Sequence, residues 1–148
     1  MFILQNYLNI KAKTVLLNRD VNIVVVTKGQ NFENIKPIID QGHLDFGENK
    51  VQEASQKWSE ILRNYPRIKL HLIGKLQSNK AKDAFYLFDY IHTLDNEKLA
   101  KILSSLENNS KKKIKYFIQV NIGNEIQKNG INLSHVKDFI GFCSKDLK

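Results

Sequence analysis

The feature that most constrains the fold is a regular alternation of short apolar runs with longer segments of helical spacing. The first run, 22–27, is rich in β-branched residues without polar alternation, which is typical of a strand buried on both faces. Four more strands are predicted over 44–47, 69–74, 90–93 and 114–122. Helices are predicted over 2–18, 32–41, 49–64, 79–88, 97–107 and 133–142. Uninterrupted alternation of this kind predicts a parallel sheet with right-handed crossovers.

Two architectures can accommodate five such strand–helix units. One is an open, doubly wound sheet, and the other is a (β/α)8 barrel that is cut short. A complete barrel needs eight units and about 250 residues, whereas this chain has 148. Periodicity alone therefore favours an open, flavodoxin-like sheet in a single domain.

Hydropathy and cysteine content bear on the compartment. No run approaches the roughly 18 uninterrupted apolar residues of a membrane span, and the apolar segment 1–4 lacks the basic flank of a signal peptide. Cys143 is the only cysteine, so no internal disulfide can form. These features predict a cytoplasmic protein without a membrane partner.

The chain carries a net charge of +8, which raises the question of a nucleic-acid or anionic membrane partner. Most of that charge is lysine, spread along the whole chain, and arginine occurs only at Arg19, Arg63 and Arg67. Arginine is preferred for base-edge and bidentate phosphate contacts, so its scarcity argues against nucleic-acid binding. We therefore expect a solvated, lysine-rich surface, and a basic binding module for RNA or membranes is the weaker hypothesis.

In either architecture, ligands bind beyond the carboxyl ends of the parallel strands. Lys28 ends the most apolar strand of the chain. A lysine shielded there by apolar neighbours would have a lowered pKa, and its neutral amine could form an imine with an aldehyde. On spacing alone, an edge lysine whose head reaches solvent is the better interpretation.

The segment 74–80 could hold an anion at a helix start, but ordinary capping by Ser78 or Asn79 is favoured.

Other sequence signatures of catalysis or metal binding are missing. There is no GxGxxG fingerprint, no GxxxxGK[ST] phosphate loop and no GxSxG elbow. The histidines lie at scattered positions without metal-ligand spacing, and we interpret each as structural: His43, His71, His92 and His135. The sequence therefore predicts no catalytic residue and no metal ligand.

Blocks of sequence at the strand ends are nevertheless specific. They include FGEN-x-VQEA from Phe46 and H-x-IG-x-LQ-x-NK from His71. The full set is Val25–Lys28, Phe46–Ala54, His71–Lys80, Gln119–Glu125 and Lys128–Gly130. In order and spacing, these blocks closely resemble the pyridoxal-phosphate homeostasis protein family.

The resemblance implies an α/β fold, a (β/α)8 TIM-type barrel of the alanine racemase N-terminal domain type. It implies that pyridoxal 5′-phosphate is held as an imine on Lys28, with Asn49 close to the cofactor. Family members are regarded as carriers or regulators of the cofactor, so the resemblance implies cofactor homeostasis and not catalysis. Residues 1–148 would form the N-terminal part of one such barrel domain, with only about the first five units present.

The sequence departs from the family pattern in two places. Thr27 stands where the family usually has a serine, which keeps the hydroxyl. The sequence ends at Lys148, before the family's later strands, which carry a serine- and glycine-rich segment for the cofactor phosphate and an arginine-glycine segment facing the pyridine nitrogen. We therefore expect weak, transient or absent cofactor binding by this chain alone. Three alternatives stay open: a racemase- or decarboxylase-like enzyme, a non-functional truncated remnant, and a split protein in which a second polypeptide supplies the missing strands.

Overall fold

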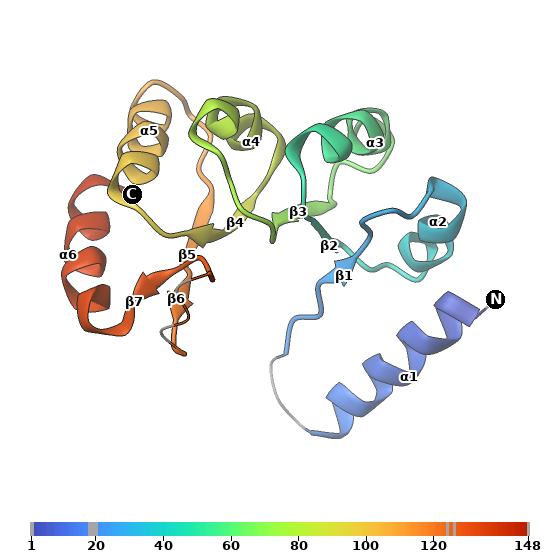
Figure 1. Ribbon diagram of the computed structural model, residues 1–148. Coiled ribbons are helices and arrows are strands. Elements are labelled where there is room, and N and C mark those ends of the chain that lie inside the picture. The colour runs from blue at the N-terminus through green and yellow to red at the C-terminus, as the bar shows by residue number, and fades with distance from the viewer. Residues whose placement is uncertain (1, 18–20, 124, 126, 148) are drawn as a thin grey trace.

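The computed structural model describes residues 2–17, 21–123, 125 and 127–147 and contains a five-stranded parallel sheet (Figure 1). Its strands lie side by side in the order in which they occur along the chain. They are β1 (Val25–Val26), β2 (Asp45–Glu48), β3 (Lys69–Leu72), β4 (Tyr90–Leu94) and β5 (Lys115–Ile118). All five lie within or overlap the predicted strand segments.

Helices connect the strands as the periodicity predicts. They are α1 (Phe2–Leu16), α2 (Phe32–Asp40), α3 (Val51–Asn64), α4 (Ala81–Leu87), α5 (Glu97–Asn108) and α6 (Val136–Asp146), with short 3₁₀ turns η1 (Ser78–Lys80) and η2 (Leu133–His135). Asparagines begin two of them: the side chains of Asn31 and Asn96 accept hydrogen bonds from the first turns of α2 and α5. Gly42, with a φ of 77°, follows the end of α2.

The arrangement of the crossovers decides between the two architectures. Figure 1 shows α2, α3, α4 and α5 on one side of the sheet, and the strand order has no point at which it reverses. A doubly wound sheet has such a reversal and carries helices on both faces. The open, flavodoxin-like sheet favoured by periodicity is therefore wrong, and the barrel implied by the resemblance is confirmed as a partial barrel of five strands. Periodicity failed here because it identifies each unit without indicating on which face the helix crosses.

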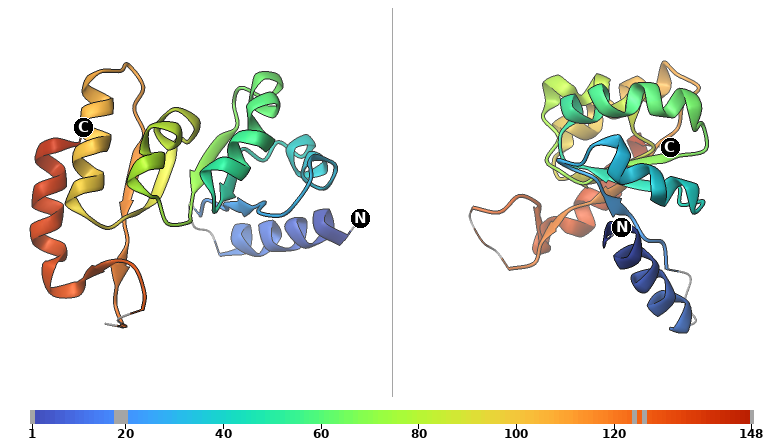
Figure 2. Two further views of the ribbon diagram at one scale, coloured as in Figure 1. Left: turned by 45° about the horizontal axis from the view of Figure 1, so that its top comes forward. Right: turned by 90° about the vertical axis from the view of Figure 1, so that its right-hand side faces the viewer.

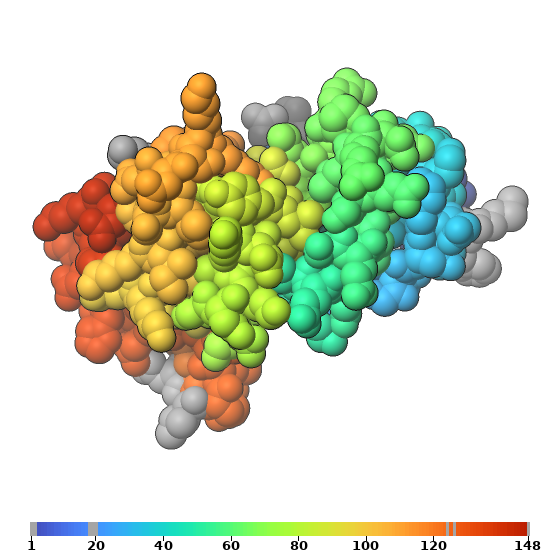
Figure 3. All heavy atoms as spheres, turned by 90° about the horizontal axis from the view of Figure 1, so that it is seen from above, coloured from blue at the N-terminus to red at the C-terminus, as the bar shows by residue number. Residues whose placement is uncertain are grey.

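The core lies between the helices and the face of the sheet that they cover. Phe46, Leu70 and Ile91 are fully buried on that face, and Trp58 of α3 and Phe85 of α4 are fully buried against it. Figure 3 shows α3, α4 and α5 closely packed over this side of the molecule. We call the five-stranded sheet with its covering helices the arc. Burial of large apolar side chains contributes about 25 cal/mol per Å² of buried apolar surface to its stability.

The opposite face of the sheet, which lines the interior in a closed barrel, is only partly covered. Residues that alternate with the core positions point to it, and among them Val26 and Phe117 are about half exposed. Figure 2 shows that α1 and the segment containing β6 and β7 lie to this side of the sheet. The strands at the two ends of the arc, β1 and β5, are its edge strands.

The predicted strand over 114–122 is interrupted at Gln119. Its N–H donates to Leu94 O at 3.0 Å, and its carbonyl accepts from Ile131 N at 2.8 Å. The chain then forms β6 (Val120–Asn121), which pairs in parallel with β7 (Ile131–Asn132) as a separate two-stranded sheet. No helix in the part of the chain that the structure describes is long and apolar enough to cross a membrane.

Candidate functional site

Lys28 lies in a tight turn directly after β1. The Gln30 N–H donates to Thr27 O at 3.0 Å, and Gly29 has a φ of 70°. This hydrogen bond closes a four-residue β-turn in which Lys28 is the second residue, and glycine readily adopts the positive φ of the third position. Lys28 is exposed, as the edge-lysine interpretation favoured by spacing predicts, and the alternative of an amine shielded by apolar neighbours is wrong.

Thr27, the residue before Lys28, is held at every polar group it has. Its N–H donates to Gly47 O at 2.9 Å, and its hydroxyl donates to Glu48 Oε1 at 2.7 Å. Its carbonyl accepts from Lys57 Nζ at 2.6 Å as well as from Gln30. Thr27 is only 2% exposed. Its contacts with β2 and with Lys57 of α3 fix its backbone, whereas Lys28 is exposed to solvent.

The carboxylate of Glu48 is the centre of these contacts. It is fully buried, and its Oε1 also accepts from Lys57 Nζ at 2.7 Å and from Trp58 Nε1 at 2.9 Å. A buried carboxylate is costly unless it is paired and hydrogen-bonded, and Lys57, with a side chain 17% exposed, supplies the opposite charge. Among the described residues, Glu48 Oε2 is the one buried side-chain oxygen or nitrogen without a hydrogen-bond partner.

Asn49 follows β2 at the same edge of the sheet as Lys28. Its backbone passes so close to the end of β3 that a Cβ at position 74 would lie 2.0 Å from Asn49 O, which explains Gly74. Asn49 lines a pocket of about 300 Å³ together with Lys75 and Lys80, and Lys28 does not line it. The structure thus places both predicted residues at the carboxyl edge of adjacent strands, but no hydrogen bond joins them in the described chain.

A side-chain cluster on the inner face of the sheet was not foreseen. His71 Nε2 lies 2.9 Å from Asp45 Oδ1, and His71 Nδ1 lies 2.9 Å from His92 Nε2. The ring of Tyr90 stacks on that of His71 with centroids 4.1 Å apart. Burial, and then the neighbouring His71, lower the pKa of His92. The sequence did carry a signal for this cluster. Asp45, His71, Tyr90 and His92 alternate with the core positions of neighbouring strands, so all four side chains point to the inner face of the sheet.

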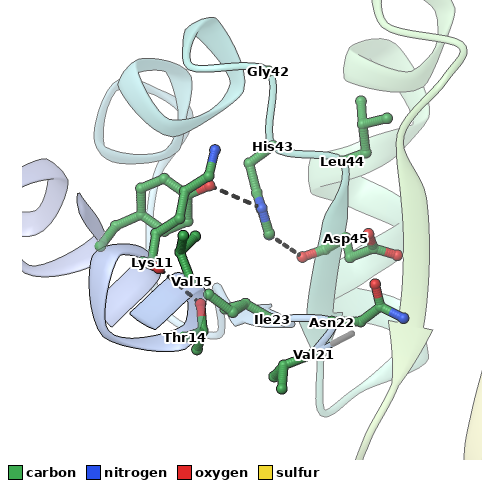
Figure 4. Close-up of a pocket in the computed structure, with 11 residues that line it drawn as sticks. Lys11, Thr14, Val15, Val21, Asn22, Ile23, Gly42, His43, Leu44 and Asp45 are labelled. Carbon is green, nitrogen blue, oxygen red and sulfur yellow. Dashed lines mark hydrogen bonds between the residues drawn. The ribbon is translucent and has the colours of Figure 1, made fainter. Parts of the chain in front are cut away.

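Another pocket of about 300 Å³ lies at the opposite, amino edge of the sheet, between α1 and the chain leading into β1 and β2 (Figure 4). His43 bridges its walls: Nδ1 lies 3.2 Å from Tyr7 Oη, and Nε2 lies 2.8 Å from Asp45 O. Burial is the largest influence on His43 and lowers its pKa. Barrel active sites lie at the carboxyl ends of the strands, so we assign this pocket to packing of α1.

Comparison with known proteins supports the geometry of the arc. The family model described as the N-terminal domain of alanine racemase matches residues 3–147. The chain belongs to this family. A solved structure of PipY from Synechococcus elongatus with PLP bound superposes with a TM-score of 0.85 at 30% identity, covering 97% of this chain and 65% of that one. The same protein without PLP gives a TM-score of 0.79 at 33% identity over 85% of this chain and 58% of that one.

Relatives in this family include curated proteins named pyridoxal phosphate homeostasis protein. One from Buchnera aphidicola subsp. Schizaphis graminum is 39% identical over 119 residues, which is 80% of this chain and 52% of that protein. One from Vibrio alginolyticus is 34% identical over 127 residues, or 84% of this chain and 54% of that protein. The chain therefore spans about half the length of the curated relatives it matches.

Proposed function

We propose that this chain binds pyridoxal 5′-phosphate weakly and reversibly through an imine on Lys28 and serves cofactor homeostasis, without a catalytic role of its own. The observation that carries the proposal is the turn after β1, which presents an exposed lysine at the carboxyl edge of the arc. The relative named PipY, whose structure has PLP bound, matches 97% of this chain, and this supports the assignment.

The residues present fit the reactive end of the cofactor. The cofactor supplies an aldehyde, which condenses with an amine to form a C=N bond while the aldehyde oxygen leaves as water. Lys28 provides the amine, and its exposure gives the aldehyde access. We propose Asn49, which follows the adjacent strand, as a second cofactor-binding residue.

A homeostasis role is favoured over racemisation by the names of the curated relatives. A racemase needs acid–base groups on opposite faces of the cofactor. The ionisable side chains of Glu48 and Lys57, which lie next to the turn, are hydrogen-bonded to each other. The homeostasis role is supported by the curated relatives named pyridoxal phosphate homeostasis protein, which are 39% and 34% identical to this chain.

Three further assignments belong to the same proposal. Residues 1–148 form the N-terminal part of a single barrel domain, and the compartment is the cytoplasm, consistent with the buried, unpaired Cys143. The edge strands β1 and β5 carry backbone groups that another polypeptide could pair with. We therefore include a second polypeptide that completes the sheet as a partner.

Lys28→Ala tests the proposal directly. Purified protein mixed with pyridoxal phosphate should develop an imine absorbance band, and borohydride should fix the cofactor on the peptide that contains Lys28. The variant should lose that band and that labelled peptide, because no other residue of the turn carries an amine. Lys36→Ala, which removes an exposed lysine of α2, is the control and should behave as the wild type. A band of equal strength in wild type and Lys28→Ala would contradict the proposal.

A further inference from the structure

We infer that Lys57, on α3, is a positioning residue that holds Lys28 in place through the backbone of Thr27. The inference rests on the proposed function and extends it to a residue that does not touch the cofactor. Lys57 lies 29 positions from Lys28 in sequence, yet its Nζ lies 2.6 Å from the carbonyl oxygen of the residue that precedes Lys28.

The contact acts on the peptide unit that begins Lys28. The Thr27 carbonyl and the Lys28 backbone nitrogen belong to one planar group, so fixing the oxygen also fixes the nitrogen and Cα of Lys28. That oxygen accepts from Lys57 Nζ and from the Gln30 N–H, which closes the turn. By holding the Thr27 carbonyl, Lys57 of α3 therefore sets the direction in which the Lys28 side chain leaves the strand.

Glu48 keeps Lys57 in this position. Its buried Oε1 holds the ammonium at 2.7 Å and is itself oriented by the Thr27 hydroxyl and Trp58 Nε1. A charge-assisted bond to a carboxylate shielded from water is stronger than its exposed counterpart. We call this set of residues, Thr27, Glu48, Lys57 and Trp58, the turn clamp.

The turn clamp differs from the ion pairs on the surface of the molecule. Lys36 and Asp40 on α2 also lie 2.7 Å apart, but both side chains are 49% exposed, and such pairs contribute little. In the turn clamp the corresponding exposures are 17% for Lys57 and 0% for Glu48. The two lysines therefore form a matched comparison with the same distance and opposite burial.

Lys57→Met, made in the full chain, tests the inference with two measurements. The first is hydrogen exchange at the Gln30 amide, which donates to the oxygen that Lys57 fixes. The second is the occupancy of Lys28 after borohydride fixation, measured by peptide mapping on protein that circular dichroism shows to be folded. We expect about tenfold faster exchange and about tenfold lower occupancy, the factor for losing one hydrogen bond to a charged group. Lys36→Met should change neither.

Lys57→Met alone leaves the Glu48 carboxylate buried without an opposite charge and could unfold the protein. A double variant that removes both charges keeps the inference testable in that case. Glu48→Gln with Lys57→Met removes both buried charges, keeps similar side-chain lengths and leaves no donor at position 57, and it should show the same loss of Lys28 occupancy. Wild-type occupancy in a folded Lys57 variant overturns the inference, as does faster exchange at Gln30 without lower occupancy. Absence of cofactor on Lys28 in the wild type refutes the proposed function itself and removes the positioning role with it.

Discussion

Gly74→Ala is expected to destabilise the protein strongly because the new methyl group has no room. An ideal Cβ at this position lies 2.0 Å from Asn49 O and 2.8 Å from both Asn49 C and Cα. Ordinary contacts between carbon and a carbonyl oxygen are about 3.3 Å, so the Asn49 carbonyl would have to retreat by about 1.3 Å. The obstacle is backbone, which cannot change rotamer. Gly74 cannot withdraw freely either, because its carbonyl accepts the Thr93 hydroxyl at 2.8 Å.

The cost should lie at the upper end of the range for overpacked sites, about 3 kcal/mol. Urea denaturation of wild type and variant measures it as a difference in the free energy of unfolding. The control is Gly141→Ala within α6, where an added Cβ meets no heavy atom within 4 Å. That change should stabilise the protein by about 0.5–1 kcal/mol, as alanine does inside helices. A Gly74→Ala protein within about 0.5 kcal/mol of the wild type would show that the chain after β2 does not approach the end of β3.

Two further predictions concern stability. Trp58→Phe should cost about 2–3 kcal/mol, since the indole is fully buried and its Nε1 donates to Glu48 Oε1 at 2.9 Å. Trp58 is the only tryptophan, so the variant has no tryptophan fluorescence and its unfolding in urea is followed by circular dichroism. An unchanged midpoint would contradict the prediction. Burial lowers the pKa of His43 and His92, so the unfolded chain binds more protons than the folded chain as the pH falls. The stability from these two groups is therefore complete above about pH 6.5 and is lost progressively below it. Urea midpoints near pH 7.5 and pH 5.5 test this, and His92→Phe should reduce the difference.

Helix positions were predictable because their signals are local. The helical spacing over 97–107 predicted α5 (Glu97–Asn108) to within one residue. The strand predicted over 114–122 was less successful because its interruption depends on Ile131, a partner that no local window contains. The face on which each helix crosses is likewise a property of the assembled sheet, so periodicity could not distinguish an arc from an open sheet.

The site was predictable only in part for the same reason. The strand end singled out Lys28, whereas its imine and the role of Asn49 came only from the resemblance. The placement of both residues at one edge of the sheet follows from parallel pairing. The role of Lys57 was not visible, because it arises where α3 packs against a strand nearly thirty residues earlier. A usable signal did exist: Glu48 ends a buried strand and is followed nine residues later by a lysine beside a tryptophan of the apolar stripe.

The strand order of the sheet also bears on how the chain folds. Each strand after β1 pairs with the strand that precedes it in sequence, so every pairing closes a single strand–helix–strand loop. Contacts between near neighbours in sequence favour rapid folding, and domains form from the N-terminus during synthesis. In a closed barrel only the pairing of the first strand with the last spans the whole chain. The arc can therefore assemble unit by unit as it leaves the ribosome, at a rate set by local loop closure and independent of ring closure.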